Sequence, residues 1–146
     1  MGQQQLLLLV LGIVIVGLAV VVGIQAFGEN QKKANSDAMT NDVIRIASDA
    51  QAWNLKPTAF GGGNGSFTNV SFEKLGYAAS GTGAASTYGN LNADYRIIGT
   101  PGATVVIQGC KVGTGNLVQA TVSGTGPGDI TTLVKNVTAC AFTLQS

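Results

Sequence analysis

The stretch LLLLVLGIVIVGLAVVVGI, residues 6–24, decides how the rest of this chain is organised. Its 19 residues include no charged or polar side chain and no proline. As an α-helix it would be about 29 Å long, which matches the hydrocarbon thickness of a bilayer. An amphipathic surface helix shows one apolar stripe, whereas this segment is apolar all round. It must therefore be surrounded by lipid or by other protein.

A removable secretion signal is the alternative interpretation of this segment. Such a signal begins with a positive stretch and has an apolar centre of about 7–15 residues. Residues 1–5 are uncharged, and the apolar run is longer than such a centre. Only Gly23-Ile24-Gln25-Ala26 resembles a cleavage site. We therefore expect the segment to remain in the mature protein.

The helical pattern continues beyond the apolar segment. Residues 25–53 contain no proline, and the first proline of the chain is Pro57. Apolar side chains then recur at intervals of four, three, four and three residues, the spacing of one helical stripe. They are Met39, Val43, Ile46, Ala50 and Trp53. The sequence predicts one helix over about residues 2–53, apolar on all sides in its first half and amphipathic in its second.

The remainder of the chain has the pattern of a small β domain. Four segments are rich in β-branched and aromatic residues and are bounded by Gly, Pro or Asn. They span residues 95–98, 103–108, 117–122 and 137–144. Residues 78–90 are small and polar without periodicity, which indicates a loop. We expect an α+β fold in which a small antiparallel sheet covers the apolar stripe of the helix. The expected divisions are residues 1–28, 29–56 and 57–146.

The composition argues against several classes of function. The net charge is +1, the first charged side chain is Glu29, and the chain has no histidine. A nucleic-acid binder needs a basic patch, and histidine is the commonest general base and metal ligand. Phosphate-binding loops and nucleophile elbows are missing from the sequence. The sequence therefore predicts no catalytic activity, no cofactor, no metal site and no specific nucleic-acid binding.

The chain has two cysteines, Cys110 and Cys140. An even count in an exported chain favours a disulfide, which would stabilise the fold by about 3–4 kcal/mol in the chain-entropy model. A buried free pair is the alternative, and a metal site would lack further His or Cys ligands.

Asn64, Asn69 and Asn136 each fit the acceptor pattern for N-linked glycosylation, a short pattern that also arises by chance.

A long helix that is apolar and then amphipathic, leading into a small β domain, resembles a type IV pilin. The closest resemblance in sequence lies in residues 5–17, QLLLLVLGIVIVG. It implies a processed, N-methylated Met1, a disulfide between Cys110 and Cys140, and a filament core built from the apolar helix. The implied core residues are Gln5, Leu6, Leu9, Gly12, Ile13, Val16, Gly17, Val20, Gly23 and Ile24.

Two positions depart from the family pattern. Pilins usually carry a glutamate where this chain has Gln5, and a helix proline where it has Val22. The glutamate is thought to neutralise the amino terminus of a neighbouring subunit. With Gln5, the helix core would have to rely on neutral hydrogen bonds instead. The helix glycines either allow close helix packing or mark weak points of the helix.

The resemblance implies a structural subunit of an extracellular filament. Its partners would be copies of itself, the membrane before assembly, a prepilin peptidase and the pilus assembly machinery. It implies location at the cell surface in the filament, and in the cytoplasmic membrane before assembly. The alternatives are a pseudopilin of a secretion system and a single-span anchored binding domain that does not polymerise.

Overall fold

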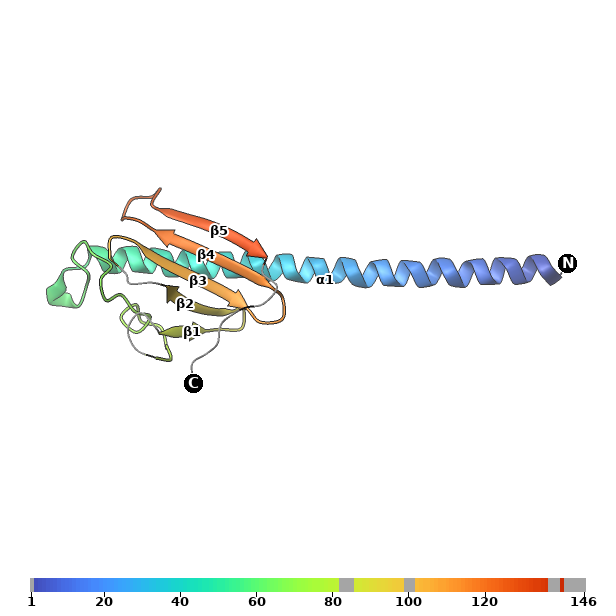
Figure 1. Cartoon of the computed structure of the whole chain (residues 1–146), viewed down its shortest axis with the longest axis horizontal. Helices are drawn as coiled ribbons and strands as arrows, with labels where there is room; N and C mark the ends of the chain where they lie inside the picture. The colour runs from blue at the N-terminus through green and yellow to red at the C-terminus, as the bar shows by residue number, and fades with distance from the viewer. Residues whose placement is uncertain (1, 82–85, 99–101, 137–139, 141–146) are drawn as a thin grey trace. The chain divides into compact units, whose positions relative to one another are not determined.

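A computed structural model describes residues 2–81, 86–98, 102–136 and 140. Helix α1 (Gly2–Leu55) comes first and is followed by the short 3-10 helix η1 (Thr58–Phe60). The described strands are β1 (Thr87–Gly89), β2 (Asp94–Ile98), β3 (Val105–Lys111), β4 (Asn116–Val122) and β5 (Ile130–Asn136) (Figure 1). The predicted α+β fold, a long helix with a small antiparallel sheet, is confirmed.

The chain divides into two compact units, Met1–Ala34 and Asn35–Ser146. We call them the helical unit and the globular unit. The helical unit holds the first part of α1, including the whole apolar stretch. The globular unit holds the remainder of α1 together with the sheet, so the amphipathic half of the helix is a structural part of the β domain.

One face of α1 forms part of the core of the globular unit. Its buried residues are Met39, Val43, Ile46, Ala47, Ala50, Trp53 and Asn54. The helix ends at Leu55, two residues before Pro57, because proline disfavours helical geometry in the residue that precedes it. Backbone amides of the next loop satisfy the last carbonyls: Gly63 N donates to Trp53 O at 2.9 Å and Gly65 N to Asn54 O at 2.8 Å.

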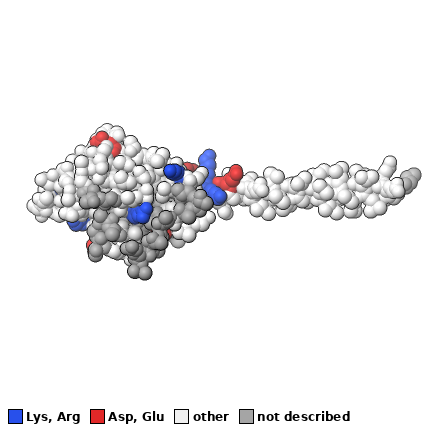
Figure 2. Space-filling view, in the orientation of Figure 1, with Lys and Arg blue, Asp and Glu red and all other residues white. Residues whose placement is uncertain are grey.

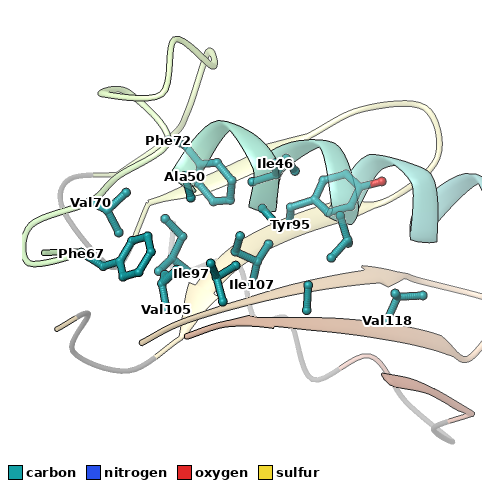
Figure 3. Packing of buried hydrophobic residues seen from close by; sticks show 14 of the residues in the cluster. Ile46, Ala50, Phe67, Val70, Phe72, Tyr95, Ile97, Val105, Ile107 and Val118 are labelled. Atoms are coloured by element: carbon teal, nitrogen blue, oxygen red, sulfur yellow. The ribbon is translucent and has the colours of Figure 1, made fainter. Parts of the chain in front are cut away.

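The five strands form an antiparallel sheet in the order β1-β2-β3-β4-β5. Burial alternates along β4 because one side of the sheet faces α1. Ile107 pairs with Ile97 on one side and with Ala120 on the other, and all three are buried. Figure 3 shows side chains from α1, from residues 67–72 and from the strands packed against one another.

Three of the predicted strands match observed strands to within a few residues, namely β2, β3 and β4. The prediction of a loop over residues 78–90 was wrong in part, because Thr87–Gly89 forms β1. This strand has only three residues and pairs on one side with β2, so it leaves little sequence pattern. Strand β5 was not predicted, although its Ile, Thr and Val residues are typical of strands. The predicted strand over residues 137–144 lies outside the described residues except for Cys140, which is not in a strand.

Candidate functional site

The apolar half of α1 exposes its side chains in this structure. All the Leu, Ile and Val side chains of residues 6–24 are more than half exposed. Figure 2 shows no charged side chain along this part of the helix, in agreement with the sequence. By length and composition α1 is able to cross a membrane, with a mean hydropathy of 3.2 in its most apolar window. Within the helical unit, as far as the structure describes it, this apolar surface stays exposed.

The residues predicted to form a filament core all lie on α1. Gln5, Leu6, Leu9, Gly12, Ile13, Val16, Gly17, Val20 and Ile24 are exposed, and Gly23 is half-buried. Met1, the predicted N-methylated terminus, lies outside the described residues.

The glycines of the apolar half offer open space on the helix surface. A Cβ atom built on Gly12, Gly17 or Gly23 would meet no atom within 4 Å. Gly12 and Gly23 are eleven residues apart, close to three helical turns, so both lie on one face. Gly17 lies on a different face because five residues correspond to about 500° of rotation. None of the described residues comes close enough to require a small residue at these positions.

A polar cluster fixes the amphipathic half of α1 to the sheet. The Asp42 carboxylate accepts hydrogen bonds from Asn90 Nδ2 at 3.0 Å, Asn92 Nδ2 at 2.8 Å and the Tyr95 hydroxyl at 2.7 Å. Asn90 and Asn92 lie in the turn between β1 and β2, and Tyr95 lies in β2. The cluster fixes the rotation of α1 relative to β2.

Burial and hydrogen bonding act in opposite directions on Asp42. Partial burial raises its pKa, but the hydrogen bonds from Asn92, Asn90 and Tyr95 and the charge of Arg45 together lower it by more, so the pKa lies below 3.8. Burial is also the largest cause of the raised pKa of Tyr95, and the hydrogen bond to Asp42 adds to it. The carboxylate and the neutral phenol are therefore the stable forms at neutral pH.

A second tyrosine contact lies two helical turns further along α1. The Tyr77 hydroxyl donates a hydrogen bond to Asp49 Oδ2. Burial raises the pKa of Tyr77, and the hydrogen bond to Asp49 raises it further. Gln51 Nε2 donates to Gly124 O at 2.8 Å and to Gly126 O at 3.2 Å, which connects α1 to the loop between β4 and β5. Hydrogen bonds thus hold α1 to the segment before β1 and to the loop between β4 and β5.

The five residues of the predicted helix stripe, Met39, Val43, Ile46, Ala50 and Trp53, all lie in the core. Trp53 Nε1 also donates to Gly61 O at 2.9 Å.

The two cysteines form a disulfide with a Cα–Cα distance of 6.0 Å. Cys110, near the end of β3, is almost completely buried.

The structure describes two of the three predicted glycosylation sites in full and the third only in part. Asn64 and Asn69 are exposed, and both adopt left-handed backbone conformations with φ of 50° and 64°. Asn136 is exposed at the end of β5, but the next two residues of its acceptor pattern lie outside the described residues.

Among the residues that are described, no group of three or more His, Cys, Asp or Glu is placed to hold a metal ion.

The polar cluster was not predicted from the sequence. Asp42 and Asp49 are seven residues apart, which places them on one helix face. This spacing is the one sequence feature that pointed to a polar contact on that face. Their hydrogen-bond partners could not be predicted, because Asn90, Asn92 and Tyr77 come from loops and turns. Loops of this kind carry no periodicity from which a contact with a helix can be predicted.

Comparisons with protein-family models, with curated proteins and with solved structures give no match to this chain. The architecture is therefore described from the sequence and structure of this chain alone. It consists of one long helix with an exposed apolar first half, and a disulfide-containing antiparallel sheet on its second half.

Proposed function

We propose that this chain is the structural subunit of a type IV pilus-like extracellular filament, polymerising through the apolar half of α1. The observation that carries the proposal is the continuity of α1. The same helix, Gly2–Leu55, exposes an entirely apolar surface in its first half and forms part of the core of the globular unit in its second. A subunit of this kind passes from lipid to a bundle of identical helices without losing its folded domain.

The exchange of lipid for protein contacts has a specific physical requirement. Lipid is as apolar as leucine, so burial of Leu and Val side chains between helices gains little hydrophobic free energy. Packing at small residues must then hold the helices together. Gly12 and Gly17 meet this requirement because each has open space where a neighbouring helix can approach.

A matched pair of substitutions at Gly12 tests the proposal. Gly12→Leu fills the open space, so filaments are lost from the sheared cell-surface fraction while the protein still accumulates in the membrane. Gly12→Ala keeps the position small and retains filaments. Both changes favour the helix itself by up to about 1 kcal/mol, so helix stability does not explain the difference. Normal filaments from Gly12→Leu would overturn the packing role.

The anchored-domain alternative makes a different prediction for the same experiment. A single-span domain that does not polymerise gives no surface filaments from the unaltered chain, and the two Gly12 variants then behave alike. A pseudopilin of a secretion system also depends on helix packing. For a pseudopilin, cells producing the unaltered chain would show no long surface filaments. Their secretion would be lost when the chain carries Gly12→Leu.

A further inference from the structure

The sheet has two edge strands, β1 and β5, which differ in length and in cover (Figure 1). Strand β1 has three residues, and Ser80 bridges its outer edge: Ser80 N donates to Thr87 O and Thr87 N donates to Ser80 O, both at 2.8 Å. Strand β5 has seven residues, and among the residues that the structure describes only β4 pairs with it. The outer row of backbone N–H and C=O groups of β5 is therefore the open edge of the described sheet.

Strand β5 lacks the features with which proteins protect an exposed edge. Such edges are short, bulged, charged or interrupted by proline. Strand β5 pairs with β4 residue by residue from Ile130 to Asn136 without a bulge, and it contains no proline and one charged residue, Lys135. Leu133 is 59% exposed and Val134 is 51% exposed, on opposite sides of the sheet because successive side chains alternate. A regular strand with apolar groups on both sides is suited to pairing with a further strand.

The charges at the two ends of β5 indicate which strand fits it. Lys135 lies near its end, and Asp129 immediately precedes its first residue. Ser123 N donates to Asp129 O at 3.0 Å, which continues the ladder between β4 and β5. Gly126 N donates to Asp129 Oδ2 at 2.7 Å, which holds the carboxylate in place. An antiparallel partner of the same sequence therefore brings unlike charges together, whereas a parallel partner in register brings like charges together.

A second copy of β5 matches this edge when the two strands run antiparallel with Thr132 opposite Thr132. Lys135 of each copy then lies directly opposite Asp129 of the other, and no like charges face one another. In the same register Val134 lies opposite Ile130. Directly opposite residues of an antiparallel pair have Cβ atoms about 4.5–5.5 Å apart, so both the charges and the apolar groups meet. The two-fold axis forms each of these contacts twice.

We propose that the β5 edge is a docking site for a second copy of this chain, whose own β5 pairs with it antiparallel with Thr132 at the two-fold axis. The two five-stranded sheets then form one continuous sheet. A two-fold contact closes on itself and does not repeat along a filament, so this pairing is separate from the helix packing of the proposed filament. It involves the globular unit alone. One pair of seven-residue strands is a small contact, so we expect weaker association than for interfaces of about 1,200–2,000 Å².

Cysteine cross-linking of the full chain in detergent micelles tests this pairing. The detergent is in large excess, so that micelles holding two chains are rare. A short bis-methanethiosulfonate reagent joins cysteines that lie side by side, and peptide mass mapping checks that the Cys110–Cys140 disulfide remains intact. Three exposed positions are compared: Thr132→Cys at the two-fold axis, Asn136→Cys as the matched control on the same strand, and Leu91→Cys as the control for random collision.

The expected result is a cross-linked dimer from Thr132→Cys, and none above the Leu91→Cys level from Asn136→Cys. In the antiparallel register the two Asn136 residues are about 27 Å apart along the strands, at about 3.4 Å per residue. A Thr132→Cys dimer no more abundant than that of Leu91→Cys overturns the proposal, whether the edge stays free or another part of the chain covers it. Equal dimers from Thr132→Cys and Asn136→Cys also overturn it, because that pattern belongs to parallel pairing.

A charge substitution in the Thr132→Cys chain tests the contact between Lys135 and Asp129. Lys135→Glu places like charges opposite each other at two places, so we expect about 2- to 30-fold less dimer, from cross-strand pair energies counted twice. Lys56→Glu, at an exposed lysine outside the sheet, is the control and should leave the dimer unchanged. Equal effects of the two substitutions would overturn the charge-matched register. Loss of filaments in Gly12→Leu leaves these cross-links unchanged, so the two proposals fail independently.

Discussion

Replacing Asp42 with asparagine tests the polar cluster that holds α1 to the sheet. In the folded protein the Asp42 carboxylate accepts three hydrogen bonds, from Asn90, Asn92 and Tyr95. Hydrogen bonds to a charged group contribute about 1.5–3 kcal/mol and neutral ones about 0.5–1.5 kcal/mol. The amide keeps an acceptor oxygen and loses the charge, so we expect Asp42→Asn to lower the free energy of unfolding by about 1–2 kcal/mol at neutral pH.

The assay is thermal unfolding of the full chain in detergent micelles, followed by the near-ultraviolet circular dichroism of buried Trp53. For a globular unit of this size, 1–2 kcal/mol corresponds to a decrease in Tm of about 4–8 °C. Asp37→Asn is the matched control because Asp37 lies on the same helix and is exposed. It should change Tm by less than about 2 °C, since surface substitutions stay within about 0.5 kcal/mol.

The pH dependence of the difference tests the direction of the effect. The pKa of Asp42 is lowered in the folded protein, so its contribution is present above the unfolded value near 3.8 and is lost as the pH falls through the lower, folded value. The difference between the unaltered chain and Asp42→Asn should therefore be constant from pH 7 to about 5 and decrease below about pH 4. An unchanged Tm at neutral pH, or a difference that does not decrease in acid, would refute the role of the carboxylate.

Two further predictions concern the same packed interface. Gly109→Ala should destabilise the globular unit by about 1–3 kcal/mol in urea unfolding, because a Cβ there would lie 2.6 Å from Tyr95 Cε1 and 3.1 Å from Val43 Cγ2. Gly128→Ala, with no atom within 4 Å of its Cβ, is the control and should be near neutral, so equal effects would contradict this reasoning. The phenols of Tyr77 and Tyr95 have raised pKa values, so their contribution is complete below pH 10 and is lost as the pH rises through the folded values. Ultraviolet difference titration should therefore show ionisation well above pH 10 that disappears in Tyr77→Phe and Tyr95→Phe. Ionisation of both phenols near pH 10 would contradict their burial and their hydrogen bonds to Asp49 and Asp42.

The long helix and its buried stripe were predictable from the sequence because both depend on short-range periodicity. The intervals between Met39 and Trp53 already place one apolar stripe on the helix, and the structure buries each of its residues. The strands β2, β3 and β4 were predictable for a related reason. They have neighbours on both sides in the sheet, and their β-branched and aromatic residues give a clear signal.

The edges of the sheet and the polar contacts were not predictable in the same way. Strand β1 is three residues long, and β5 is exposed along almost its whole length, so neither shows alternating burial. The contacts of Asp42 join residues about fifty positions apart in the chain. Side-chain contacts between a helix and distant turns depend on the tertiary fold, which local pattern does not report.

Electron microscopy of material sheared from the surface of cells producing this protein is the sharpest test of polymerisation. We expect thin, regular filaments whose dominant protein band has the mass of this chain. In such filaments we expect the apolar halves of α1 to form the core and to bury Gln5 there without a carboxylate. Retention of all the protein in the membrane fraction, with no filaments, would contradict the filament proposal and would leave a membrane-anchored domain in its place.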